Sequence, residues 1–165
     1  MKITIYTDGS SRGNPGPGGW AAVIMTHEEV IELGGREDVT TNNRMELSGA
    51  LFGLKEIGDN ASEVEVCTDS QYVKKGMTEW IGGWIKKGWI GSTKKPVLNK
   101  DLWVALKTEE DRLKSFGAKV VWKYVPAHVG VVMNERADTI ATMCADNASS
   151  LQLYRGPISA YTVIS

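Results

Sequence analysis

Four acidic residues stand where their side chains could meet. Asp8 and Asp69 each close an expected strand and open a turn, within Tyr-Thr-Asp-Gly-Ser and Cys-Thr-Asp-Ser-Gln. Glu46 lies in the first turn of an expected helix, and Asp138 follows Asn134 by one helical turn, so that these two share a face. Four close negative charges repel unless cations neutralise them, and all-oxygen ligation selects hard ions. We therefore expect a Mg²⁺ or Mn²⁺ site, where two ions about 4 Å apart would activate a water and stabilise a leaving oxygen in phosphoryl transfer.

Each of these carboxylates also has an ordinary structural explanation. Asp69 stands where it could cap a helix. Glu46 follows Asn43 by three residues, which imitates a capping box with Asn43 as the N-cap. Asp138 could belong to a solvated helix surface. The spacing alone therefore indicates a plausible metal cluster and leaves the structural explanations open.

The elements that must position these residues follow from hydrophobic periodicity. Alternation of apolar residues predicts strands at 2–8, 20–26, 29–35, 63–69 and 119–125. Three- and four-residue steps predict helices at 43–58, 99–116 and 134–146, and two short helices within 70–89 that break around Gly76. The segment from Gly9 to Gly19, with its glycines and prolines, is expected to be an irregular loop.

This order of elements defines an α/β domain. The first three strands form an antiparallel meander, and helical crossovers make the first, fourth and fifth strands parallel. Asp8 and Asp69 then emerge at the same carboxyl edge of the sheet, where open α/β sheets place their chemistry. Residues 147–165 are expected to form a tail, in which Tyr161–Ile164 could add an edge strand.

Composition excludes several classes of protein. The chain has 165 residues, of which 42% are apolar and 24% charged, as expected for one globular domain. Its longest apolar run, Trp20–Met25, is far shorter than the roughly 20 residues of a membrane span. Cys67 and Cys144 are too few for a disulfide framework and lack CxxC spacing, so buried thiols are expected. We expect a cytoplasmic monomer without an obligate protein partner.

The small net charge of −1 conceals a strong segregation of charge. Residues 71–100 contain seven lysines and one glutamate, which gives this window an excess of positive charge. Three tryptophans, Trp80, Trp84 and Trp89, are interleaved with these lysines. Lysines neutralise phosphates without reading sequence, and aromatic faces pack on sugars and bases. The segment is therefore a candidate nucleic-acid surface.

Five motifs, in this order and spacing, closely resemble type 1 ribonuclease H of the bacterial kind. They are Tyr6–Ser10, Gly13–Gly19, Thr41–Leu47, Thr68–Val73 and His128–Asp138. The resemblance covers residues 1–146. It implies a ribonuclease H-like fold with a five-stranded mixed sheet flanked by helices. It also implies an endonuclease that hydrolyses the RNA strand of RNA–DNA hybrids with two metal ions, leaving 5′-phosphate and 3′-hydroxyl ends.

The resemblance also implies roles for single residues. The family's four metal-binding carboxylates match Asp8, Glu46, Asp69 and Asp138, with Mg²⁺ as the expected ion and Mn²⁺ as a possible substitute. His128 matches the family's mobile-loop histidine, which assists proton movement or product release. In this chain the residues that follow His128 read Val-Gly-Val-Val-Met, where family members commonly carry a more polar loop. An apolar loop could pack down and restrict the histidine.

Substrate contacts are implied in the same way. Residues 74–100 resemble the basic protrusion that grips the DNA strand, with Lys86, Lys87 and Trp80 as contacts and with Trp84, and to a lesser degree Trp89, expected in the core. Asn14, Asn43 and Gln71 resemble minor-groove contacts, where amides meet 2′-hydroxyls and base edges. Thr41 with Asn14 resembles a pocket for a DNA phosphate. Asn42 and Asn134 complete the predicted substrate-binding residues.

Two other functions remain open at this point. A resolvase or integrase with the same carboxylate fold would cut DNA junctions or duplexes. A non-catalytic module would bind hybrids without cutting them. The matches at Asn14, Asn43 and Gln71 favour the hybrid nuclease over the first, and four intact carboxylates count against the second.

Overall fold

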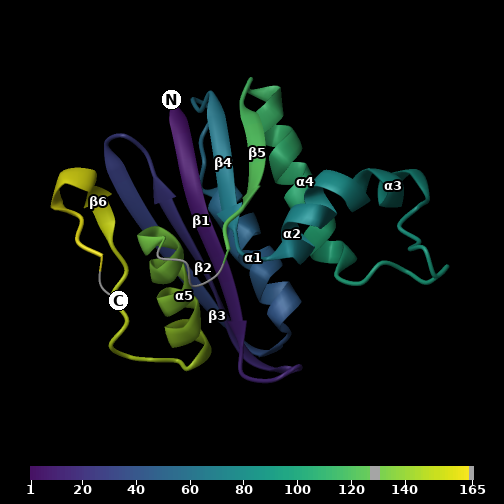
Figure 1. Ribbon diagram of the computed structural model, residues 1–165, viewed down its shortest axis with the longest axis horizontal. Helices are drawn as coiled ribbons and strands as arrows, with labels where there is room; N and C mark the ends of the chain where they lie inside the picture. The colour runs from purple at the N-terminus through teal and green to yellow at the C-terminus, as the bar shows by residue number, and fades with distance from the viewer. Residues whose placement is uncertain (127–130, 164–165) are drawn as a thin grey trace.

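A computed structural model describes residues 1–126 and 131–163 of the chain. In this part, six strands form one mixed sheet in the order β5-β4-β1-β2-β3-β6 (Figure 1). The strands are β1 (Lys2–Ser11), β2 (Gly16–Met25), β3 (Glu29–Thr40), β4 (Glu63–Thr68), β5 (Lys119–Tyr124) and β6 (Arg155–Pro157). The helices are α1 (Asn42–Lys55), α2 (Gln71–Lys75), α3 (Ile81–Lys86), α4 (Lys100–Ser115) and α5 (Val132–Ala145). A π-helical turn, η1 (Gly76–Trp80), joins α2 to α3, and a 3-10 turn, η2 (Ile158–Ala160), follows β6.

The predicted topology is confirmed. β1, β2 and β3 pair antiparallel, while β1 pairs parallel with β4, and β4 pairs parallel with β5. The sheet has one strand more than expected, because β6 pairs antiparallel with the outer edge of β3, with Arg155 opposite Ile31. The predicted edge strand at Tyr161–Ile164 is wrong for its described residues, since Tyr161 turns inward and donates a hydrogen bond to Glu32 instead.

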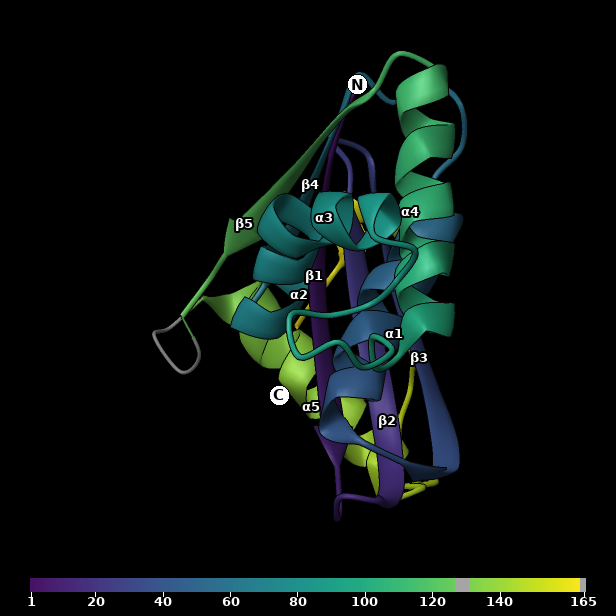
Figure 2. The same ribbon diagram turned by 90° about the vertical axis from the view of Figure 1, so that its right-hand side faces the viewer.

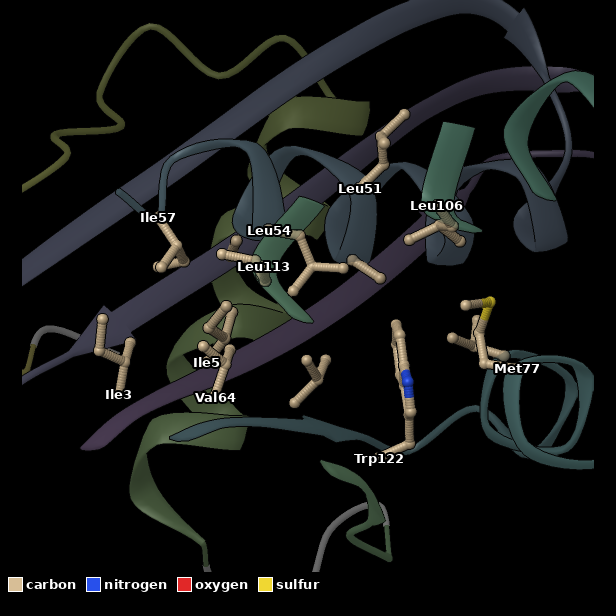
Figure 3. Close-up of a cluster of buried hydrophobic side chains, with 14 of the residues drawn as sticks. Ile3, Ile5, Leu51, Leu54, Ile57, Val64, Met77, Leu106, Leu113 and Trp122 are labelled. Carbon is tan, nitrogen blue, oxygen red and sulfur yellow. The ribbon is translucent and has the colours of Figure 1, made fainter. Parts of the chain in front are cut away.

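Helices cover both faces of the sheet (Figures 1 and 2). α1 and α4 lie on one face and α5 on the other, against β1, β2 and β3. The inner face of α1 carries buried Leu47, Ala50, Leu51 and Leu54 at the three- and four-residue steps that predicted the helix. Figure 3 shows Leu51 and Leu54 packed with side chains of β1, β4 and α4 in the main core.

The glycine-rich segment is not the irregular loop that its composition predicted. β1 continues to Ser11 and β2 begins at Gly16, so only Arg12–Pro15 lies outside the ladder. Glycines occur in these strand ends because other backbones approach them closely. A Cβ atom on Gly19 would overlap the carbonyl oxygen of Ala141 in α5. The segment therefore brings β2 and α5 together, which sequence composition does not reveal.

The predicted change at Gly76 is confirmed, since α2 ends at Lys75 and η1 begins at Gly76 and leads directly into α3. Gly76 packs against the indole of Trp103, where a Cβ atom would overlap the ring. Trp84 and Trp89 pack half-buried against the core, as expected, whereas the side chain of Trp80 is 38% exposed. The α2–α3 segment thus extends to one side of the sheet as a protrusion (Figure 1). Contacts of the Trp84 ring with Trp80 and with buried Trp103 anchor it.

The two cysteines lie in buried or half-buried positions. Cys67 is buried, and burial raises the pKa of its thiol to about 12, while Cys144 is half-buried. Both cysteines are free thiols. Within residues 1–126 and 131–163, the helices lack the combination of length and apolar character that crossing a bilayer requires.

Candidate active site

Three carboxylates meet at the carboxyl ends of the two central parallel strands. Asp8 lies in β1, Asp69 follows β4 directly, and Glu46 lies in the first turns of α1. Each offers one carboxylate oxygen, and the three oxygens lie within 4.8 Å of one another. Asp8 and Glu46 are buried and Asp69 is half-buried. The parallel pairing of β1 with β4 is what brings residues 61 positions apart to this point.

Burial makes this cluster electrostatically unfavourable by itself. Burial, followed by the charge of Asp69, raises the pKa of Asp8 to about 8. Burial and then the charges of Asp8 and Asp69 raise the pKa of Glu46 well above its usual range. The backbone N–H of Gly9 donates to Asp8 Oδ1 at 2.8 Å, which opposes the rise only partly. Divalent cations would relieve both desolvation and repulsion, so the donor set fits a metal site.

A cavity of about 150 Å³ opens from these carboxylates toward α5. Its lining includes Asp138 and Asn134, together with Glu135, and among the described residues that line it there is no lysine or arginine. Asp138 is exposed, whereas Asn134 is buried. Within residues 1–126 and 131–163, the Oδ1 atom of Asn134 and the Oε2 atom of Glu46 have no hydrogen-bond partner. Two buried oxygens without partners in one acidic cavity support cation binding there.

Glu135 and Gly9 also line this cavity, and neither was among the predicted site residues. Glu135 is the one of the two with a titratable side chain. It precedes Asp138 by three residues, and this spacing places both on one side of α5. It is exposed, so the cavity has Asp138 and Glu135 at its solvent side and Asp8 and Glu46 at its base. The three-residue spacing between Glu135 and Asp138 was the feature of the sequence that could have identified Glu135 as a lining residue.

A second cavity, of about 330 Å³, collects the polar residues at the start of α1. It is lined by Asn14, Thr41, Asn42, Asn43, Leu98 and Asn99. The N-cap of α1 is Thr41, whose hydroxyl accepts from the N–H of Arg44 at 3.2 Å, and the expectation that Asn43 caps this helix is wrong. The extended backbone of Thr41 (φ −125°, ψ 161°) starts the helix two residues earlier, which leaves the amides of Asn42 and Asn43 exposed.

Arg44 connects the two segments that line this second cavity, the start of α1 and the start of α4. Its guanidinium donates to both carboxylate oxygens of Asp101, at 3.0 and 2.8 Å, and to Asn99 Oδ1 at 3.3 Å. These contacts tie α1 to the start of α4. Asn99, which sequence reasoning did not select, has a left-handed backbone (φ 61°) and donates to the Tyr72 hydroxyl at 3.1 Å. The sequence indicates a structural role for Asn99 only through its position immediately before a helix, where Asn is a preferred residue type.

The protrusion carries a third cavity, of about 400 Å³, lined by Trp80, Gly83, Trp84, Lys87, Ile90 and Ser92. Lys87 and Trp80 therefore lie together, while Lys86 is exposed at the end of α3 outside this lining. Gln71 is exposed at the first position of α2, two residues after Asp69. His128 lies outside the described residues, so its predicted role stays a prediction.

The mixed sheet and its carboxylate cavity together define a metal-dependent phosphodiester hydrolase. The family model for RNase H matches residues 1–146 of the chain. The chain therefore belongs to the ribonuclease H family, and the predicted activity, endonucleolytic cleavage of the RNA strand of RNA–DNA hybrids, is confirmed at the level of the family. The two alternatives, a junction nuclease and a non-catalytic module, are thereby set aside.

Curated relatives agree along most of the chain. The Ribonuclease H of Chromohalobacter salexigens is 47% identical over 145 residues, which are 88% of this chain and 85% of that protein. The Ribonuclease H of Phenylobacterium zucineum is 46% identical over 155 residues, which are 94% of this chain and 97% of that protein. The second comparison extends beyond residue 146 into the tail.

Solved structures share the fold. LC9-RNase H1, described as a type 1 RNase H with the type 2 active-site motif, is 27% identical with a TM-score of 0.75, covering 93% of this chain and 76% of its own. LC11-RNase H1, solved in complex with an RNA/DNA hybrid, is 28% identical with a TM-score of 0.67, covering 90% of this chain and 99% of its own. The RNase H-like architecture predicted from the sequence is confirmed.

Proposed function

We propose that this chain cleaves the RNA strand of RNA–DNA hybrids at the cavity lined by Asp8, Glu46, Asp69 and Asp138. These residues would hold two Mg²⁺ ions, with Mn²⁺ as a possible substitute. The observation that carries the proposal is the meeting of three carboxylate oxygens within 4.8 Å at the base of a cavity whose described lining is acidic and contains no lysine or arginine. The hybrid complex of the related LC11-RNase H1 supports the substrate.

The chemistry divides between the ions and the chain. Bound divalent ions supply a nucleophilic water at neutral pH and charge stabilisation for the departing 3′-oxygen, so that the products carry 5′-phosphate and 3′-hydroxyl ends. Asp8 and Glu46, rigidly placed and buried, fix the ligand oxygens. Asp138 and Asn134 close the cavity from α5 and can orient groups at its solvent side. His128 would accept or supply a proton, as the resemblance to the family implies.

Substrate binding is assigned to the two outer cavities. The side chains of Asn14, Thr41 and Asn43 present donors and acceptors to one strand. Gln71, exposed at the first position of α2 and two residues after Asp69, presents a further amide. Lys87 and Trp80 present a charge and an exposed ring from the protrusion. A hybrid offers phosphates for the lysines and 2′-hydroxyls for the amides.

A substrate panel tests the proposal. Hybrid, duplex DNA and duplex RNA of one sequence would be incubated with EDTA, then with Mg²⁺ or Mn²⁺ over a range of concentrations. We expect internal cleavage of the RNA strand in the hybrid alone, dependent on the added ion, and a phosphatase should remove a 5′-phosphate from the product on the 3′ side of the cut. Cleavage in EDTA, or equal cleavage of duplex DNA, would overturn the proposal.

We also propose that the enzyme acts as a monomer in the cytoplasm. A single chain supplies all the carboxylates of the cavity, so the site is complete without a second copy. Light scattering coupled to gel filtration measures the mass of the particle directly. The location remains a prediction from composition, which fractionation of expressing cells would check.

A further inference from the structure

A buried ion pair lies behind the carboxylate cavity. Arg136 of α5 donates from Nε to Glu32 Oε2 at 2.7 Å and from Nη2 to Glu32 Oε1 at 3.0 Å, across to β3. The two side chains are only 4% and 2% exposed. A buried pair of this kind is favourable only when further hydrogen bonds satisfy its remaining donors and acceptors.

The segment after residue 146 supplies those hydrogen bonds. The Tyr161 hydroxyl donates to Glu32 Oε2 at 2.6 Å, and the N–H of Tyr154 donates to Glu32 Oε1 at 2.9 Å. Arg136 Nη2 also donates to the carbonyl of Gln152 at 2.9 Å. The tail, defined as residues 147–163, therefore completes a network that joins β3 to α5.

The same network bears on the helix that lines the cavity. Arg136 stands between Asn134 and Asp138, both of which line the carboxylate cavity. Successive helical residues are about 100° apart, so Arg136 points about 200° away from Asn134 around the axis of α5. Anchoring Arg136 to β3 thus fixes the rotation at which α5 presents Asp138. At a side-chain radius of about 6 Å, a 10° rotation would move that carboxylate by about 1 Å.

Packing and hydrogen bonding both act on this rotation. The buried face of α5 combines the small side chains Ala137, Ala141 and Ala145 with Ile140, whose methyl group fills the space beside Gly34. A Cβ atom on Gly19 would overlap the carbonyl oxygen of Ala141, so this helix lies very close to β2. The paired guanidinium and carboxylate add a directional contact to β3 on the side of α5 that carries Arg136.

We propose that Tyr161, Glu32 and Arg136 are positioning residues for the active site, through which the tail holds Asp138 and Asn134 in place. The inference rests on the proposed function, because it assigns Asp138 to metal binding. It gives the tail a catalytic consequence beyond the match of the family model, which ends at residue 146.

One pair of variants separates positioning from stability. Tyr161→Phe removes the hydroxyl that reaches Glu32, whereas Tyr154→Phe removes a hydroxyl that donates to the carbonyl of Pro157 inside the tail at 2.6 Å. The two rings contact each other in a tilted arrangement, with centroids 5.0 Å apart and an interplanar angle of 50°, and both variants keep these rings. Both leave the backbone donor at Tyr154 intact.

The readouts are Mn²⁺ affinity by calorimetry, hydrogen exchange of α5, and kcat and KM on a hybrid. For Tyr161→Phe we expect Mn²⁺ binding about 3- to 10-fold weaker, at or below the 10- to 100-fold cost typical of losing an outer-shell partner. We expect faster exchange in α5 and a lower kcat with unchanged KM. Tyr154→Phe should stay within about 2-fold of the unmodified protein in each. Equal effects of both variants, or no effect of either, would overturn the inference.

A second comparison distinguishes this inference from the proposed function. Asp138→Asn should itself weaken Mn²⁺ binding, and adding Tyr161→Phe to it should cause no further loss. If Asp138→Asn leaves Mn²⁺ binding and cleavage unchanged, the proposed function fails. If Asp138→Asn weakens both while Tyr161→Phe behaves like Tyr154→Phe, only the positioning role fails.

Discussion

The backbone nitrogen of Glu46 occupies the space that a side chain on Gly9 would need. A Cβ atom built on Gly9 would overlap that nitrogen and the carbonyl carbon of Met45. The end of β1 and the first turns of α1 therefore touch backbone to backbone. The close contact between the two backbones brings the carboxylates of Asp8 and Glu46 together, so that one cation could reach both.

Gly9→Ala should damage the active site without changing any of its carboxylates. The added methyl group must push α1 from β1, since backbone atoms cannot move aside as a side chain does, at a cost of about 1 to 3 kcal/mol in unfolding free energy. Urea denaturation and hybrid cleavage would measure the two effects. Gly82→Ala is the control, because nothing lies within 4 Å of its Cβ position in α3. That variant should gain up to about 1 kcal/mol and keep full activity.

Asp8→Asn should abolish cleavage while the protein remains folded. Loss of a direct ligand is expected to cost more than about 100-fold in kcat, the upper range for an outer-shell partner. Steady-state cleavage of a hybrid with Mg²⁺ measures this, and circular dichroism checks the fold. Asp59→Asn, at an exposed position outside the cavity lining, is the matched control. Activity near the normal level in Asp8→Asn would contradict the assignment.

The stability of the metal-free protein should depend on pH through this cluster. The pKa of Asp8 rises from 3.8 in the unfolded chain to about 8 in the folded one, and that of Glu46 rises as well. The folded protein then binds more protons between these values, so the stabilising contribution is complete below about pH 4 and is lost as pH rises toward 8.

Urea denaturation in EDTA at several pH values would test this expectation. The unfolding free energy of the unmodified protein should fall relative to that of Asp8→Asn between pH 5 and pH 8.5, and Mg²⁺ should reduce the difference. Relative stabilities that do not vary with pH would show that the carboxylates titrate normally.

Neutralising Lys86 and Lys87 should weaken hybrid binding and flatten its salt dependence. Each phosphate contact contributes about 0.9 to the slope of log affinity against log salt, so Lys86→Gln with Lys87→Gln should reduce the slope by about 1 to 2. Fluorescence anisotropy of a labelled hybrid in Ca²⁺ would measure it. The double variant Lys55→Gln, Lys119→Gln is the control. It changes the net charge by the same amount outside the protrusion, at the last residue of α1 and the first residue of β5. An equal slope change in that control would indicate a general charge effect.

His128→Ala should reduce turnover more than binding. A general acid or base contributes about 10²- to 10⁴-fold, and a histidine that also assists product release would lie at the lower end. Single-turnover and multiple-turnover cleavage, compared at saturating Mg²⁺, separate the two roles. His27→Ala, at an exposed turn between β2 and β3, is the control. A normal kcat in His128→Ala would remove the histidine from the mechanism.

Secondary structure was predictable where periodicity was strong. The steps of Leu47, Leu51 and Leu54 identified α1, and alternation identified the central strands, because burial on one face repeats with the period of the element. Prediction failed where the glycines of residues 9–19 were interpreted as a loop. Gly19 lies inside β2, where the backbone of α5 occupies the space of a side chain, and Gly76 lies where the indole of Trp103 does. In both places the reason for glycine is a neighbouring segment from elsewhere in the chain, which the local sequence does not show.

The tail shows the same division between local and distant information. The sequence of residues 147–165, with Arg155 as the single charged residue, indicated a tail without an assigned function. An edge strand was expected at Tyr161–Ile164, whereas β6 lies at Arg155–Pro157. The structure places Tyr154 and Tyr161 against Glu32, more than a hundred residues earlier. Hydrogen bonds to a buried ion pair leave no local pattern in a sequence.

The sequence by itself determined the chemistry of this protein. Motif residues such as Asp8 and Asp69 identified the family and predicted the ligands and the class of metal, because catalytic side chains must be chemically exact. Tertiary structure alone decided their geometry: which oxygens lie within 4.8 Å, that Asn134 is buried without a partner for its oxygen, and that the tail reaches Arg136. Distances between side chains depend on packing among distant segments, and this information is spread over the whole chain.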